Sequence, residues 1–151
     1  MTLECDQESG DWVLTNQTHL IYDGRVILEH RNVNNASVLT LTRGLDLSGT
    51  LQGAGGIGGL LALTRQLRAG PEHLYYHADG IGNVTCLINT NNAVVAGYEY
   101  DPFGGLLLLW GPKAALNPYR FSSKPVQEPS GMYDFLYRWY APALQEVSGN
   151  Q

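Results

Sequence analysis

YYHADGIGNVTCLINTNNAVVAGYEYDPFGGLLLL, residues 75–109, states one pattern twice. Tyrosines lead into an aspartate and a glycine turn, first at Asp79 and again at Asp101, 22 positions later. That spacing is too short for two parallel strands with a helical crossover, and it suits strand, turn, strand, turn. The stretch therefore predicts an all-β fold built as an antiparallel meander.

The turns of this stretch contain residues that reverse a chain at low cost. Glycine tolerates positive φ, and aspartate or asparagine side chains bond their own backbone. β-branched and apolar runs at 84–88 and 93–100 predict strands, with a further turn at 89–92. The repeated turn motif comprises Tyr22, Asp23, Gly24, Asp79, Gly80, Gly82, Asn83, Tyr100, Asp101, Pro102 and Gly104.

The N-terminal half repeats this architecture. Residues 19–22 and 25–29 predict two strands joined by a two-residue turn at Asp23-Gly24, which is a strong hairpin signal. A turn at 32–35 and a third strand at 37–42 follow. Asp23 and Asp46 are 23 positions apart, close to the later offset of 22.

Composition limits the classes of function. The chain has 151 residues, of which 44% are hydrophobic and 15% charged, and 18 glycines and seven prolines favour short strands. Most of the net charge of −5 lies in residues 1–11, which we expect to form an acidic tail without strands. The near-neutral remainder predicts no nucleic-acid partner, and no signal peptide or membrane span is evident.

The C-terminal half carries motifs that resemble the Rhs repeat-associated core region, and the tyrosine-aspartate turns resemble the YD repeats of Rhs proteins. A weaker resemblance extends upstream through residues 22–24 and 44–49, so that it covers most of the chain. The core motifs are, in order, Tyr98-x-Tyr100-Asp101-Pro102-Phe103-Gly104, Gly111-Pro112, Asn117-Pro118-Tyr119-Arg120-Phe121-Ser122, Gly131-Met132-Tyr133 and Arg138-Trp139-Tyr140-x-Pro142.

The resemblance implies a segment of a hollow β-shell. Rhs chains enclose a C-terminal toxin or effector, a core region plugs the shell, and an aspartyl autoprotease motif of Asp-Pro-x-Gly type releases the toxin. The expected organisation is a YD-repeat sheet over 12–110, with a glycine-rich connector at 49–59, followed by a core-like region over 111–151. The family context suggests a secreted or cell-surface location.

The chain departs from the family pattern after Tyr140. The expected cleavage motif is replaced by Ala141-Pro142 and the residues that follow. The pattern Asp-Pro-x-Gly does occur at Asp101-Pro102-Phe103-Gly104, but this site lies upstream, within the repeat. We therefore expect a truncated, non-enzymatic structural fragment without autoprotease or toxin. Its partners would be the remaining repeat chain, its own copies through sheet edges, or a toxin cargo. The alternatives are a small adhesive or carbohydrate-binding module and a residual aspartyl protease.

Gly53-x-Gly55-x-x-Gly58 matches the dinucleotide-binding pattern, and residues 60–67 after it could form a helix. That fingerprint needs parallel strands and a helix of useful length, but Gly70-Pro71 would end this helix early. We expect no cofactor. A flexible connector followed by a strand at 60–64 is the favoured interpretation, and it predicts that Gly55→Ala changes stability little.

Two pairs of polar residues are candidates for a metal site or a catalytic site. His73 and His77 lie four positions apart, but no third ligand completes a zinc motif, so we expect solvated or edge-strand histidines and no metal. Asp79 and Asp101 occupy the same phase of the repeat, as a carboxylate pair would. Repeating turns place an aspartate at that phase for capping alone, so we expect no catalytic residue there.

Four rings alternate with other residues near the C-terminus, at Tyr133, Phe135, Tyr137 and Trp139. A period of two predicts that they share one face of a strand. As a binding site they would form a stacking platform for a sugar or a peptide. The favoured interpretation is that they cover and close the end of a β-sheet, because aromatic rings bury large areas.

Overall fold

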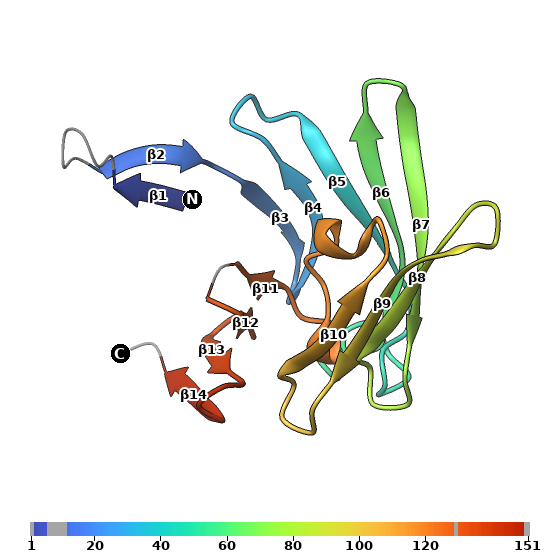
Figure 1. Cartoon of the computed structure of the whole chain (residues 1–151), viewed down its shortest axis with the longest axis vertical. Coiled ribbons are helices and arrows are strands. Elements are labelled where there is room, and N and C mark those ends of the chain that lie inside the picture. The colour runs from blue at the N-terminus through green and yellow to red at the C-terminus, as the bar shows by residue number, and fades with distance from the viewer. Residues whose placement is uncertain (1, 6–11, 129, 150–151) are drawn as a thin grey trace.

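An eight-stranded antiparallel sheet forms the body of the computed structural model, which describes residues 2–5, 12–128 and 130–149 (Figure 1). The spatial order of the strands is their order in the sequence, so the predicted all-β meander is confirmed. The strands are β3 (His19–Asp23), β4 (Val26–Arg31), β5 (Ser37–Arg43), β6 (Leu60–Leu67), β7 (Gly70–Ala78), β8 (Val84–Asn89), β9 (Val94–Tyr100) and β10 (Leu106–Trp110).

Four of the turns share one hydrogen-bond pattern. The first residue is Asn or Asp, and its Oδ1 accepts the N–H groups two and four positions later, at 2.8–3.0 Å. The fourth residue has positive φ, between 59° and 88°, which explains why it is Gly or Asn. The first and fourth residues are Asn32 and Asn35, Asp79 and Gly82, Asn89 and Asn92, and Asp101 and Gly104.

The first predicted turn is displaced by one residue. Asp23 pairs with Val26, so Gly24 and Arg25 form the turn, where Asp23-Gly24 was expected. Gly24 has φ of 57°. The side chain of Gln52, rather than that of Asp23, satisfies the backbone here, since it accepts from Arg25 N at 2.8 Å and donates to Asp23 O at 2.9 Å.

The glycine-rich segment is a folded loop followed by a strand. Leu60–Leu67 pairs antiparallel with β5 and β7, so the strand prediction is confirmed and the helix that a dinucleotide fingerprint requires does not form. Asp46 organises the loop by accepting hydrogen bonds from Ser48 N and Oγ, Ala54 N and Gly56 N. Burial raises the pKa of Asp46, but these hydrogen bonds outweigh it and lower the pKa to about 2.

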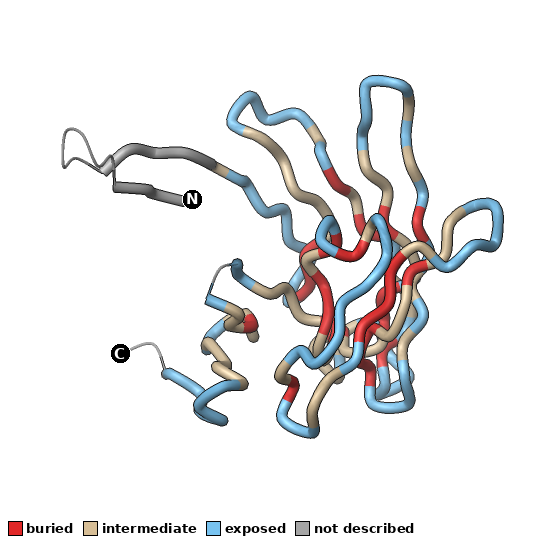
Figure 2. Tube along the Cα trace, viewed as in Figure 1, coloured by how far each residue is buried: buried red, intermediate tan, exposed pale blue. Residues whose placement is uncertain are grey.

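The core lies on the concave face of the curved sheet. The C-terminal half returns to cover that face with residues 111–128, which we name the plug, including the short 3₁₀ turns η1 (Ala114–Leu116) and η2 (Phe121–Ser123). Buried residues concentrate between sheet and plug (Figure 2). The cluster comprises Ile27, Leu39, Leu41, Leu60, Leu63, Leu74, Val84, Leu87, Ala96, Tyr98, Ala114 and Tyr119.

Two smaller sheets flank this body. One is the hairpin β1 (Thr2–Cys5) and β2 (Trp12–Asn16); residues 2–5 therefore differ from the expected strand-free acidic tail, while residues 1 and 6–11 lie outside the described residues. The other contains β11 (Val126–Gln127), β12 (Met132–Asp134), β13 (Arg138–Ala141) and β14 (Glu146–Gly149). Among the described residues, no helix has the length and hydrophobicity to cross a membrane.

The shared turn pattern can be tested at Asn89, whose Oδ1 accepts from Asn91 N and Ala93 N. Asn89→Ala removes the acceptor for both N–H groups, and we expect a loss of about 1–2 kcal/mol in the free energy of unfolding. Asn89→Asp keeps the oxygen and should lose much less. Urea denaturation of both variants measures the difference, and equal losses would contradict the assigned role.

Candidate functional site

The plug is held on the concave face mainly by polar contacts from its central residues. Asn117 is fully buried, and its Oδ1 accepts from the Tyr76 hydroxyl at 2.8 Å and from Tyr119 N at 3.1 Å. Its Nδ2 donates to Tyr119 O at 2.6 Å. Burial raises the pKa of Tyr76 well above its usual value, so the phenol stays protonated and donates. One amide thus fixes the plug backbone and joins it to β7.

Tyr119 is the largest fully buried side chain of the plug, and it joins the plug to β4 and β5. Its hydroxyl lies 2.7 Å from His30 Nε2, and the two rings meet edge to face. The Arg43 guanidinium lies over the Tyr119 ring at 5.8 Å and donates to Ile27 O at 2.8 Å. Burial lowers the pKa of both His30 and Arg43.

The Asp79 turn holds the next part of the plug. Ser122 N donates to Asn83 Oδ1 at 2.8 Å, and Ser123 Oγ donates to Gly82 O at 2.7 Å. Ser122 and Ser123 have φ of 53° and 56°, a conformation that is uncommon for non-glycine residues. The contacts with the turn keep both serines in this conformation.

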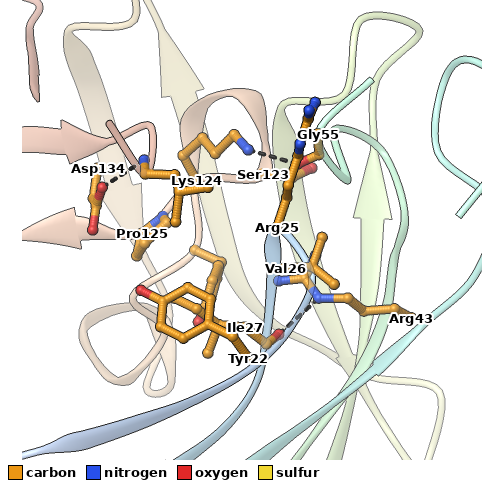
Figure 3. Close-up of a pocket in the computed structure, with 12 residues that line it drawn as sticks. Tyr22, Arg25, Val26, Ile27, Arg43, Gly55, Ser123, Lys124, Pro125 and Asp134 are labelled. Atoms are coloured by element: carbon orange, nitrogen blue, oxygen red, sulfur yellow. Dashed lines mark hydrogen bonds between the residues drawn. The ribbon is translucent and has the colours of Figure 1, made fainter. Parts of the chain in front are cut away.

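Lys124 joins the plug to the glycine-rich loop (Figure 3). Its Nζ donates to Gly55 O at 2.6 Å, and burial lowers its pKa. Gly55 has φ of 65°, so an added Cβ is strained, and the expectation that Gly55→Ala has little effect is not supported. A cavity of about 20 Å³ beside Lys124, Arg43 and Asp134 has room for one water molecule.

Arg120 is a buried cation within the plug. Its guanidinium lies 5.7 Å from the centre of the Tyr98 ring, and Nη1 donates to Glu128 Oε1 at 2.9 Å. Nε has no hydrogen-bond partner among the described residues. Backbone atoms add a further link, because Val84 N donates to Arg120 O at 3.1 Å.

The aromatic residues near the C-terminus do not share one strand face, so that prediction is wrong. The chain reverses between β12 and β13, where Leu136 has φ of 72° and its N–H donates to Asp134 Oδ1 at 2.7 Å. Tyr133 therefore pairs with Tyr140, while Trp139 pairs with Asp134. Of the four predicted rings, Tyr133, Phe135, Tyr137 and Trp139, only Tyr133 and Phe135 enter the aromatic cluster around Phe121 and Tyr140.

The carboxylates of the turn aspartates accept hydrogen bonds from the backbone of their own turns. Asp79 and Asp101 line one groove of about 530 Å³ together with Glu99, so the structure does bring them to the same region. Each carboxylate accepts two backbone N–H groups of its turn, and Asp79 also accepts from the Asn83 amide. These are the contacts expected of turn capping.

His73 and His77 lie on β7 with Tyr75 between them. Each ring bonds a threonine on a neighbouring strand, His73 with Thr64 at 2.9 Å and His77 with Thr85 at 2.7 Å. Four strand residues span about 13 Å, which is too far for two rings to share one metal ion.

The sequence pattern did not single out the residues that hold the plug. Asn117 and Tyr119 lie in a motif that was quoted only for its family resemblance, and His30 follows directly after the strand predicted over 25–29. An asparagine and a tyrosine inside a proline-containing, strand-free segment are the only sequence signal for such a buried polar anchor.

Comparisons with known proteins give structural matches only. No protein-family model and no curated protein matches the chain. A crystal structure of TcdB2-TccC3 matches with TM-score 0.61 and 18% identity, over 96% of this chain and 7% of that chain. A Photorhabdus luminescens Tc holotoxin pore with a substituted TccC3 matches with TM-score 0.57 and 18% identity, over 93% and 6%.

A crystal structure of TcdB2-TccC3 without the hypervariable C-terminal region matches with TM-score 0.51 and 14% identity, over 99% of this chain and 9% of that chain. At these identities the matches show a shared fold. This chain spans less than a tenth of the length of each matched chain.

The burial of His30 makes the stability of the fold depend on pH. Because burial lowers the folded-state pKa of His30, the unfolded state binds more protons once the pH falls below about 6.5. The charged groups that line the cleft beside His30 are Arg65, Arg120 and Glu128, and Arg43 lies across the Tyr119 ring. Stability is therefore retained above this pH and is lost as the pH falls through it.

His30→Gln keeps a hydrogen-bonding side chain but does not titrate. We expect the melting temperature of the native chain to fall more than that of His30→Gln between about pH 7.5 and about pH 5.5. The other histidines are present in both proteins, so the difference in slope isolates His30. Parallel slopes in differential scanning calorimetry would contradict this assignment.

Proposed function

We propose that the chain is a non-enzymatic structural segment of an Rhs-type β-shell, in which further strands continue its sheet. The structural matches support this proposal, because the fold is shared with segments of TcdB2-TccC3 chains, which are far longer than this one. The Rhs resemblance implies that such a shell encloses a toxin, and one of the matched structures is that of a Tc holotoxin pore, so we take toxin enclosure as the larger function of such a segment.

The main observation behind this proposal is that, among the described residues, the two outer strands of the main sheet each have an unpaired edge. Within the described part of the chain, no strand pairs with the outer edge of β3 or of β10. Both strands are exposed along their length, and β10 consists of Leu106–Trp110, LLLLW, without a charge. Unpaired edges of this kind accept another strand readily, and stable monomers usually protect them with charges or prolines.

The polar groups around the plug support a structural role. The carboxylates of Asp79 and Asp101 accept backbone N–H groups of their own turns. The side chains of Asn117, Tyr119 and Ser123 bond the main sheet or its turns, at Tyr76, His30 and Gly82. Each of these contacts fixes the position of a segment, as expected for a plug that covers the inner face of a shell wall.

Association through β10 is the first test. Leu107 is 68% exposed at an irregularity in the pairing with β9, so Leu107→Lys adds a charge to the edge without removing a core contact. We expect the native chain to elute as dimers or larger species and Leu107→Lys to shift toward monomer. Light scattering coupled to size exclusion measures the mass.

Leu51→Lys is the matched control, because Leu51 is 60% exposed in the glycine-rich loop between β5 and β6 and belongs to neither edge strand. It should leave the mass distribution of the native chain unchanged. A native chain that stays monomeric at all concentrations would refute association through β10.

The absence of self-cleavage is the second test. We expect intact-mass spectrometry after prolonged incubation to show one species, since the Asp101 carboxylate is engaged in its turn. A fragment ending near Pro102 or Tyr140 that disappears in Asp101→Asn would establish an aspartyl protease and refute the structural proposal.

A further inference from the structure

A separate site with an apolar lining lies between the plug and the sheet of β11–β14. It is a cavity of about 320 Å³, within the range of ligand sites, and it is lined by Phe121, Phe135, Arg138, Tyr140 and Val147. Phe121 comes from the plug, Phe135 from the turn after β12, and the other three from β13 and β14. Three rings from separate segments therefore converge on one opening.

The rings of this cavity are held by contacts on their other sides. Phe121 packs against Tyr100 and Tyr133, with ring centres 6.0 and 5.7 Å away. The Tyr140 hydroxyl donates to Phe103 O at 2.5 Å, and Tyr140 stacks on Phe121 at 6.1 Å. The walls are thus formed before any partner binds, which lowers the entropic cost of binding.

Arg138 is the one charged residue that lines the cavity. It is exposed and forms no salt bridge within the described part of the chain, whereas the four other lining residues are aromatic or aliphatic. A complementary partner has an apolar body that fills the cavity and an anionic group that reaches the guanidinium.

The fifth lining residue, Val147, lies on an edge strand. β14 is the last strand of its sheet, so one side of its backbone has no paired strand in the described residues, and Val147 is 54% exposed. An extended peptide can pair with such an edge and place alternate side chains to one face. A side chain on that face would lie next to Val147, at the cavity.

We propose that this cavity and β14 form a binding site for an acidic, extended peptide of a partner protein. The peptide adds a strand to β14, inserts an aromatic side chain between Phe121, Phe135 and Tyr140, and places a neighbouring carboxylate at Arg138. This site is independent of the β3 and β10 edges, so the proposal goes beyond the structural role.

A sugar fits the site less well. A carbohydrate needs several polar partners around an aromatic floor, and the Tyr140 hydroxyl is already bonded to Phe103 O. Only Arg138 then remains as a polar side chain of the lining. Charge complementarity and the adjacent strand edge both favour a peptide.

The test uses the full chain and the peptide acetyl-Glu-Val-Phe-Val-Glu-amide, titrated by isothermal calorimetry and by amide chemical shifts. We expect saturable binding with shifts centred on β14. Replacing both glutamates of the peptide by lysine, or its phenylalanine by alanine, should weaken binding about tenfold or more.

Two variants on exposed positions test the site itself. Arg138→Gln removes the cation and should weaken binding about tenfold, and Val147→Trp fills the opening and should abolish it. Arg68→Gln, an exposed cation in the turn after β6, and Tyr137→Ala, an exposed ring that does not line the cavity, should bind as the native chain does.

Three outcomes would overturn the proposal. They are no saturable binding of the peptide, equal binding by Arg138→Gln and Val147→Trp, and equal affinity for free phenylacetate, which would mark a site for small aromatic acids. Association through β10 is tested separately, by light scattering on the native chain. A failure of peptide binding can therefore be told apart from a failure of the proposed structural function.

Discussion

A single curved sheet has one apolar face that must be covered, and here the chain covers it with its own residues 111–128. The plug contains no strand long enough to form a second sheet layer, and its backbone is instead satisfied by turns and by polar side chains. Asn117 and Tyr119 are buried for that reason, and the side-chain polar groups of both residues have partners whose loss would leave them unpaired.

The turns of the sheet do two things at once. The side-chain oxygen of Asp79 closes its own turn, and the same turn then presents Gly82 O and Asn83 Oδ1 to two serines of the plug. Asp46 likewise orders the loop whose Gly55 carbonyl receives Lys124. Connections between strands thus provide the attachment points for the segment that fills the core.

Local patterns predicted the sheet well, because strand alternation and turn chemistry act over a few residues. Residues 75–109 predicted strands and turns, and a strand at 60–64 was favoured over a helix; the structure has a strand there, which extends over Leu60–Leu67. Two local predictions failed. The first turn lies one residue later than predicted and bonds the distant side chain of Gln52, and a reversal at Leu136 divides the aromatic residues between two strands. The polar anchors of the plug join residues far apart, which no local pattern encodes.

The order of segments along the chain has a kinetic consequence. Neighbouring strands of the main sheet follow one another in sequence, so each hairpin closes a short loop and can form early. The plug contacts span much longer separations: His30 and Tyr119 are 89 positions apart, and Gly55 and Lys124 are 69 positions apart. During synthesis from the N-terminus, every strand that the plug touches in the main sheet has left the ribosome before the plug itself. Docking of the plug then follows formation of the main sheet, and the sheet with its apolar face still uncovered is the species that a chaperone would meet.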